Sequence, residues 1–290
     1  MIHGKPAGDL ISPAENTWCP GCGNFSIEHM MKSALAELSE SEGIGLEKFV
    51  LVGGIGCHGK LVDYLNVNSY YAIHGRAIPL ATGIAVANPD LRVICFVGDG
   101  DTYAEGLGHL IFAAKRNADI TVIVHDNRVY GLTTGQYTPT SPYGFKGRST
   151  PGGITERPIN PLELMLVSGA TFISRGYTKR LKPLKETFKE AILHKGFSFV
   201  EILQICATYF NRTDCYNEQV YAVADEGLGT ASFDQALAKS REWDYTSKTR
   251  IPLGTFYRRE MPVFGEKFQE FSRREKRREE AVRDLLEGYR

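Results

Sequence analysis

The sequence lacks both a long apolar run and an excess of charge of one sign. No stretch approaches the ~20 consecutive apolar residues that a membrane-spanning helix needs, so we expect no membrane protein. The 34 lysines and arginines balance the 34 aspartates and glutamates. This balance argues against nucleic acid as a partner, because its binding depends on neutralising phosphates. No apolar signal region is visible at the N-terminus, and we therefore expect a cytoplasmic protein.

Cysteine is also scarce, with 6 residues in 290. Structural disulfides are rare in a reducing compartment, so cysteines in spaced sets are better interpreted as ligands of a metal or a cluster. The remaining composition, 42% hydrophobic and 23% charged, is ordinary for a globular protein. The length allows one large domain or two modest ones.

The most informative stretch runs from residue 93 to residue 132. Residues 93–97 form an apolar run that ends abruptly in Gly98-Asp99-Gly100-Asp101, which places a carboxylate on a tight turn after a predicted buried strand. Residues 103–117 have the apolar spacing of a helix, and residues 120–124 form a second short apolar run. The pattern predicts strand, helix, strand. Ligands bind at the carboxyl ends of such strands.

A right-handed crossover would bring Asn127 to the edge where Asp99 lies. The 26 residues between Gly100 and Asn127 suffice for one helix and one strand. Mg²⁺ prefers oxygen ligands in octahedral geometry, and Asp99, Asn127 and the Val129 carbonyl could supply the protein's share beside two phosphate oxygens. The spacing resembles the thiamine diphosphate motif. Gly-Asp-Gly alone is also common in ordinary turns.

A second motif, Trp18-Cys19-Pro20-Gly21-Cys22-Gly23, precedes a helical pattern over residues 25–38. A thioredoxin-type dithiol is one alternative, since a Cys-x-x-Cys at a helix start lowers a thiol pKa. That fold needs a strand directly before the motif, and Pro13, Glu15 and Asn16 oppose one. Half of a zinc site is the other alternative.

A third cysteine lies in a glycine-rich turn. Residues 49–52 read as a strand, and residues 53–60, which include Cys57, follow it. Glycines let backbone amides approach a phosphate or a cluster closely. His74 stands at the entrance of a predicted small-residue helix, residues 77–87; a lone histidine is more often structural than functional.

The rest of the chain continues the alternation of strands and helices. Residues 133–153 have no periodicity and predict a functional loop. The remaining expectations are helices at 161–168 and 181–195, strands at 171–174 and 199–205, the latter the last clear strand, and a mixed-charge helical tail at 272–290. The alternation predicts an α/β fold with a doubly wound, mostly parallel sheet. We expect an α/β domain over residues 1–217 that binds thiamine diphosphate and an iron-sulfur cluster, and a partner-contacting C-terminal extension over residues 218–290.

Taken together, several segments resemble the beta subunit of the 2-oxoacid:ferredoxin oxidoreductases. They are WCPGCGN, GIGCHGK, HGRAIPLATGIAVANPDL, VGDGD, DNRVYGLTTGQYTPTS and EILQICATY, in the family's order. The late stretch IPLGTFYRREMP resembles family members that act on 2-oxoglutarate.

The resemblance implies roles for single residues. Asp99, Asn127 and Val129 would ligate Mg²⁺. Four cysteines would ligate a 4Fe-4S cluster: Cys19, Cys22, Cys57 and Cys206. Thiamine diphosphate would contact Ile55, Gly56, Cys57, His58, His74, Gly98, Asp99, Gly100, Asp101, Asn127, Val129, Gly131 and Leu132, with His74 as the catalytic candidate. Cys95 reads as buried filler and Cys215 has no role. The His58-Gly59 pair and Thr134 depart from the family's commoner residues, which bears on substrate selectivity.

The implied reaction is the coenzyme A-dependent oxidative decarboxylation of a 2-oxo acid, with single electrons passing through the cluster to ferredoxin. The resemblance favours 2-oxoglutarate, giving succinyl-CoA; pyruvate or a broad range of 2-oxo acids is an alternative. The distal carboxylate would need a cation, from Arg128, Lys60 or a partner.

We also expect a larger alpha subunit, in an α2β2 assembly. Thiamine catalysis needs a carboxylic acid on the aminopyrimidine ring, and Glu28 and Glu105 are the nearby candidates in this chain, both at positions typical of structural roles. A non-redox thiamine enzyme and a zinc-bound interaction module remain alternatives. The first has no use for the four spaced cysteines, and the second has no use for thiamine.

Overall fold

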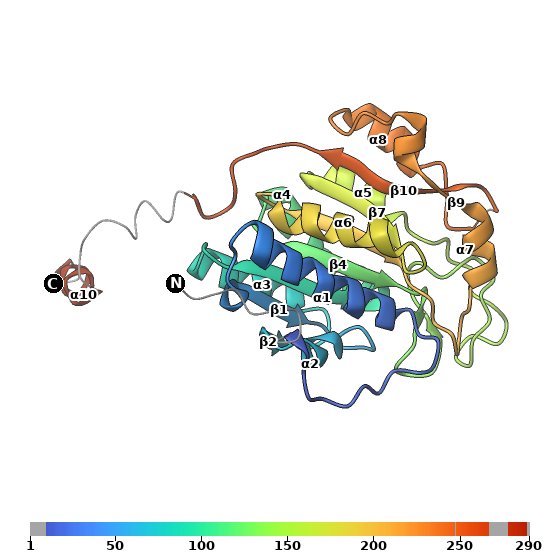
Figure 1. Cartoon of the computed structure of the whole chain (residues 1–290), viewed down its shortest axis with the longest axis horizontal. Helices are drawn as coiled ribbons and strands as arrows, with labels where there is room; N and C mark the ends of the chain where they lie inside the picture. Colours follow the sequence, from blue (N-terminus) through green and yellow to red (C-terminus); the bar gives the residue numbers. More distant parts are fainter. Residues whose placement is uncertain (1–9, 247, 267–277, 289–290) are drawn as a thin grey trace.

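A computed structural model describes residues 10–246, 248–266 and 278–288 (Figure 1). Its centre is an eight-stranded sheet of order β2-β1-β3-β4-β8-β7-β10-β9. The strands are β1 (Phe49–Gly53), β2 (Asn68–Tyr71), β3 (Arg92–Gly98), β4 (Thr121–Asp126), β7 (Phe172–Tyr177), β8 (Ser198–Leu203), β9 (Val220–Ala222) and β10 (Ile251–Arg258). Neighbouring strands run parallel except β7 and β10. The predicted doubly wound, mostly parallel sheet is confirmed.

Helices cover both faces of the sheet. One face carries α1 (Asn24–Ser41) and α6 (Leu181–Leu193), which lie across the near side in Figure 1. The other face carries α3 (Ala77–Ala87), α4 (Leu107–Arg116), α5 (Pro161–Ser168) and α8 (Phe233–Ser240). Alternate residues of the central strands belong to the hydrophobic cores on the two faces of the sheet. In β3, Ile94 and Phe96 pack toward α1 and α6. Val93, Cys95 and Val97 pack toward α3 and α4. This period of two is what a strand buried on both faces requires.

Short elements complete the chain. They are the helical turns η2 (Leu46–Lys48), α2 (Leu61–Tyr64), η3 (Asp101–Glu105), α7 (Thr213–Gln219) and η4 (Val223–Glu226), the hairpin of β5 (Val129–Tyr130) and β6 (Gln136–Tyr137), and helix α10 (Arg278–Glu287). The predicted C-terminal helix is confirmed over α10, and residues 272–277 and 289–290 lie outside the described residues. Within the described ranges no helix is long and apolar enough to cross a membrane.

The helices predicted at 77–87 and 161–168 are confirmed with those bounds, as α3 and α5. The prediction that residues 199–205 hold the last strand is wrong, because β9 and β10 join the same sheet beyond β7. Pro252 and Gly254 within β10 hide that strand, since both residues are depleted in strand interiors. The C-terminal extension therefore adds two strands to the sheet.

The sheet order brings three turns together. Strands β1, β3 and β4 are adjacent and parallel, so their carboxyl ends, at Gly53, Gly98 and Asp126, lie along one edge. The glycine-rich turn, the GDG segment and the Asn127 turn follow these ends directly. The expected meeting of Asp99 and Asn127 at one sheet edge thus follows from topology.

Candidate functional site

A small cavity of about 80 Å³ lies at the meeting point of these three turns. Its lining includes every residue that the sequence predicted to contact the cofactor, from Ile55 to Leu132. Tyr130 and Thr133 also line it, and the sequence had given no reason to select them. Residues spread over nearly eighty positions of the chain therefore share one cavity.

The two glycines of the GDG segment are required by close approach. Gly100 has helical dihedral angles, φ −64° and ψ −48°. Its backbone conformation therefore does not explain why this position is a glycine. A Cβ at Gly100 would lie 2.2 Å from the Tyr130 ring, and one at Gly98 would lie 2.6 Å from Nδ1 of His58. Any side chain here would displace the rings that line the cavity.

Asp99 is buried, with 2% of its surface exposed, and it begins the helical segment that continues into η3. The expectation that it lies on a tight turn is wrong, because the chain passes from β3 into a helix without a loop. Burial raises the pKa of its carboxyl above the usual range. The Thr140 hydroxyl lies 2.9 Å from Oδ2 of Asp99 and 2.8 Å from Oδ1 of Asp126. Asp126 is fully buried too, and its carboxyl pKa is raised well above the usual range by burial and then by Asp99.

Arg128 stabilises the turn after β4 through hydrogen bonds from its side chain. This residue has a φ of +65°, in the left-handed region that side chains other than glycine rarely adopt. Its guanidinium is buried; Nε donates to the Thr140 carbonyl at 2.7 Å and Nη2 donates to the Tyr245 carbonyl. The proposal that Arg128 could bind a substrate carboxylate is wrong, because its donors are engaged inside the protein. Its neighbour Asn127 accepts a hydrogen bond from the Val129 amide at 3.0 Å.

Asp101 contacts the residues on the side of the cavity that His58 and His74 form. Its Oδ1 accepts hydrogen bonds from His74 Nδ1 at 2.6 Å and from the Gly75 amide at 2.7 Å. Its Oδ2 lies 3.5 Å from Nε2 of His58. The same oxygen would be 1.8 Å from a Cβ at Gly54, so Gly54 has to be glycine for this carboxylate to fit. Asp101 therefore fixes His74 by a hydrogen bond and lies beside His58.

The cysteines converge beside this cavity. The Cys19-x-x-Cys22 loop is tied to the other two cysteine segments by the Trp18 indole, which donates to the Cys57 carbonyl at 2.7 Å, and by the Gly23 amide, which donates to the Ile205 carbonyl at 2.9 Å. Burial, and to a smaller extent the neighbouring thiols of Cys57, Cys206 and Cys19, raise the pKa of the Cys22 thiol to about 11. Three segments from distant parts of the chain thus gather four thiols.

Gly131 lies beside both the thiols and the cavity. A Cβ at Gly131 would lie 3.7 Å from the sulfurs of both Cys57 and Cys206. Gly131 and Cys57 also line the cavity. The cysteines therefore adjoin the cavity, and Cys57 is part of its lining.

The remaining cysteines lie elsewhere. Cys95 is buried in the core of the sheet under α3, as expected for filler. Cys215 lies on α7, where Arg212 donates to its sulfur at 2.9 Å and its thiol donates to Gln219 at 3.1 Å. Cys206, not Cys215, is the late cysteine that reaches the other three.

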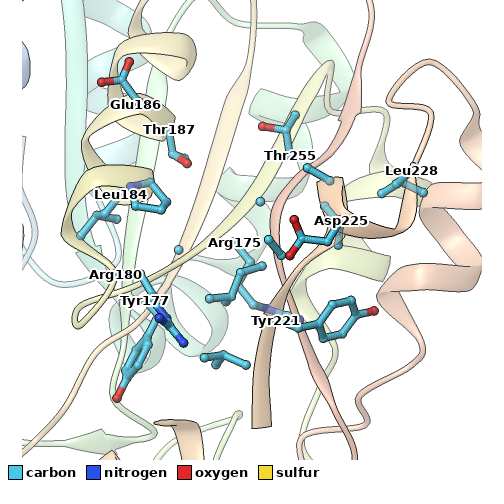
Figure 2. A pocket seen from close by; sticks show the side chains of 18 of the residues that line it. Arg175, Tyr177, Arg180, Leu184, Glu186, Thr187, Tyr221, Asp225, Leu228 and Thr255 are labelled. Carbon is cyan, nitrogen blue, oxygen red and sulfur yellow. The ribbon is translucent and has the colours of Figure 1, made fainter. Parts of the chain in front are cut away.

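A larger cavity, of about 890 Å³, lies beside α6 at the end of the sheet formed by β7, β10 and β9 (Figure 2). Figure 2 shows Leu184 and Thr187 of α6 on one wall and Tyr221 and Asp225 on the other. None of the sequence-predicted site residues lines it. We assign the site to the smaller cavity, because the carboxylates, histidines and thiols converge there.

Comparison with known proteins agrees with this geometry. The family model for the thiamine pyrophosphate enzyme, C-terminal TPP binding domain, matches residues 54–202, so the chain contains a domain of that family. A 2-oxoacid:ferredoxin oxidoreductase beta subunit from Sulfolobus sp is 40% identical over 89% of this chain and 87% of its own length. This chain belongs to the 2-oxoacid:ferredoxin oxidoreductase beta-subunit family. The resemblance that the sequence motifs indicated is confirmed.

Two further similar proteins have names that refer to 2-oxoglutarate. The 2-oxoglutarate synthase subunit KorB of Methanocaldococcus jannaschii is 35% identical over 86% of this chain and 90% of its own length. A chain of the 2-oxoglutarate:ferredoxin oxidoreductase from Magnetococcus marinus, solved with 2-oxoglutarate, coenzyme A and succinyl-CoA bound, superposes with a TM-score of 0.89 at 33% identity. That match covers 98% of this chain and 96% of the other. As a beta subunit, this chain is part of an oxidoreductase with a partner subunit.

Proposed function

We propose that this chain is the subunit of a 2-oxoglutarate:ferredoxin oxidoreductase that holds the diphosphate of thiamine diphosphate through Mg²⁺ and also binds a 4Fe-4S cluster. The observation that carries the proposal is that Gly131 and Cys57 both line the cofactor cavity, and that a Cβ at Gly131 would lie 3.7 Å from the sulfurs of Cys57 and Cys206. Electrons released in the cavity would therefore have only a short distance to travel to a cluster held by these sulfurs. No thiamine enzyme without a redox step needs such an arrangement.

The residues present suit Mg²⁺. Asp99 is a buried carboxylate next to the cavity with no basic side chain bonded to it among the described residues, and a bound cation would offset the cost of its burial. The side-chain oxygen of Asn127 and the carbonyl of Val129 would add two more oxygen ligands. A hard cation with a preference for oxygen fits this donor set.

The four thiols suit a cluster better than a zinc ion. A single zinc would draw its sulfurs to roughly 3.8 Å from one another, as Zn–S bonds of about 2.3 Å at tetrahedral angles require. Among the described residues no group of three or more His, Cys, Asp or Glu side chains is placed to hold one metal ion. A 4Fe-4S cluster is larger and keeps its cysteine ligands farther apart.

When bound, thiamine diphosphate supplies the carbon nucleophile and electron sink for decarboxylation of a 2-oxo acid. The chain's own residues position it. Asp101 holds Nδ1 of His74, so Nε2 is the ring nitrogen that is left to hydrogen-bond inside the cavity. Tyr130 donates to Glu105 at 3.2 Å and packs edge-on against His74, which fixes the ring at the cavity mouth.

Two chemical groups that the reaction needs are missing from the cavity lining. Its carboxylates, Asp99 and Asp101, already have partners, and its described lining contains no lysine or arginine. Glu28 pairs with Lys32 on α1, and Glu105 accepts from Tyr130. Lys60 donates a hydrogen bond to the hydroxyl of Thr17, which precedes the Cys19-x-x-Cys22 loop in the chain. The alpha subunit would therefore supply both the carboxylic acid for the aminopyrimidine and the cation for the distal carboxylate, in an α2β2 assembly that reduces ferredoxin.

The substrate proposal follows the relatives. The Methanocaldococcus protein is named for 2-oxoglutarate, and the Magnetococcus structure contains it. The stretch 251–262, which suggested this substrate, forms β10 and the segment after it. A higher kcat/KM for 2-oxoglutarate than for pyruvate in the assembled enzyme is expected. Equal values would support the broad 2-oxoacid range for which the Sulfolobus relative is named.

Metal and cofactor analysis of protein purified without oxygen tests the binding proposal. We expect iron and sulfide in equal amounts, no zinc, and thiamine diphosphate that is retained only with Mg²⁺. A colourless zinc protein without thiamine would contradict the proposal.

A further inference from the structure

Gln204 is hydrogen-bonded both to the end of β4 and to one of the four clustered cysteines. It follows β8 directly and stands two residues before Cys206. Its backbone amide donates to the Asp126 carbonyl at 3.0 Å, so it is fixed to the turn that leads to Asn127. The residue is 2% exposed. The Gln204 side chain is therefore shielded from water, and the hydrogen bond to Asp126 fixes its backbone.

The side-chain amide of Gln204 points at a cysteine sulfur. Its Nε2 lies 3.4 Å from Sγ of Cys22, and its Oε1 has no hydrogen-bond partner among the described residues. A neutral thiol could donate its hydrogen to an amide oxygen. A metal-bound thiolate has no hydrogen and can only accept one. A glutamine that presents its NH₂ group to Cys22 therefore matches a sulfur that ligates a metal.

We infer that Gln204 tunes the reduction potential of the cluster by donating a hydrogen bond to the Cys22 sulfur. The inference rests on the proposed 4Fe-4S cluster. Reduction adds one negative charge to a cluster and its thiolates, and a donor on a thiolate stabilises the more negative state. Because the Gln204 side chain is buried, water does not replace this donor in a variant that fills the same space. Gln204 thus makes the cluster a better acceptor for electrons from the adjacent cavity.

The structure offers a matched control. Gln219 is also hydrogen-bonded to a cysteine, accepting from the Cys215 thiol at 3.1 Å, but Cys215 lies outside the group of four. The two glutamines differ in which cysteine they contact. Gln219→Leu should therefore leave the cluster potential unchanged.

The test is a redox titration of the assembled enzyme, followed by the magnetic resonance signal of the reduced cluster. Gln204→Leu should lower the potential by about 60 mV, which corresponds to a tenfold change in a one-electron equilibrium. Its iron and thiamine contents should match the wild type. An unchanged potential in a fully loaded Gln204→Leu protein would overturn the inference.

A second variant covers the case in which leucine prevents cluster assembly. Gln204→Met keeps the length of the side chain and removes the donor, and it should show the same lowered potential. A Met variant with wild-type potential, or a Gln219→Leu variant with an equal shift, would also overturn the inference. Wild-type protein that contains no iron would refute the proposed cluster itself, which separates the two failures.

Discussion

The guanidinium of Arg128 donates a hydrogen bond to the backbone carbonyl of Tyr245, which lies 117 residues later in the chain. Arg128 stands between the two proposed Mg²⁺ ligands of its turn, and Tyr245 belongs to the C-terminal extension. The rings of Trp243, Tyr245 and Phe210 surround the same guanidinium at 5.5 to 6.0 Å. The extension therefore supports the turn that is proposed to bind Mg²⁺, and it does so from outside the stretch that the thiamine-binding family model matches.

Replacing Arg128 should loosen this turn. Arg128→Met removes the donors to Thr140 and Tyr245, and we expect thiamine diphosphate affinity at saturating Mg²⁺ to fall at least tenfold, since hydrogen bonds from charged groups contribute about 1.5–3 kcal/mol each. A cofactor titration measures the change. Arg212→Met is the control, because Arg212 also contacts Phe210 but lies outside the turn. Equal affinities in all three proteins would show that Arg128 does not position the ligands.

Replacing Asp99 should abolish cofactor retention without removing the cluster. Asp99→Asn keeps the shape of the buried side chain and its contact with Thr140, but it removes the charge that would balance Mg²⁺. Asn127→Ala should be milder, because it removes a neutral ligand. Thiamine and iron contents of the purified proteins test this, with the exposed Asp90→Asn as control. Wild-type thiamine content in Asp99→Asn would refute the assignment.

Cys206 and Cys215 should respond differently to serine. Cys206→Ser should lose iron or alter the signal of the reduced cluster, since its sulfur lies beside that of Cys57. Cys215→Ser should keep both, because Cys215 contacts Arg212 and Gln219 on α7. A damaged Cys215 protein alongside an intact Cys206 protein would show that the fourth ligand is assigned wrongly.

Stability should fall in mild acid because of His194. Burial lowers the pKa of this imidazole to about 4, and its Nε2 is 2.8 Å from the Thr171 hydroxyl. The unfolded chain binds this proton from about pH 6.5 downward and the folded chain does so only near pH 4, so stability is full above pH 6.5 and declines as the pH falls toward 4. Urea unfolding at pH 7 and pH 5 should show a loss of about 1–2 kcal/mol, after allowance for partial solvent access.

His194→Gln should remove most of that difference between the two pH values. His29 is exposed, and His29→Gln should retain the wild-type difference. If the His194 and His29 variants behave alike, the acid sensitivity has another origin.

The sequence predicted those parts of the site that lie directly after the ends of strands. Asp99 and Asn127 could be placed together because each follows an apolar run and parallel strands end at the same edge. Gly98, Gly100 and the four cysteines were found as motifs, although the reason for the glycines, the rings of His58 and Tyr130, was visible only in three dimensions.

Other parts could not be predicted from local patterns. The four residues of β2 are all exposed and show no alternation, and β10 contains Pro252 and Gly254. Arg128 looked available for substrate because a sequence does not show that an arginine is buried. Thr140 and Gln204 were missed because their importance lies in partners 41 and 182 residues away.

The central claim is that electrons leave the cofactor cavity through a cluster held by this chain. Adding 2-oxoglutarate and coenzyme A, without ferredoxin, to the assembled enzyme tests it most directly, with the magnetic resonance signal of the cluster as readout. We predict that a reduced-cluster signal forms in the wild type and not in Cys206→Ser, and that the isolated chain shows none until the alpha subunit is added. Consumption of 2-oxoglutarate with no reduced cluster, or turnover by the isolated chain, would contradict the account.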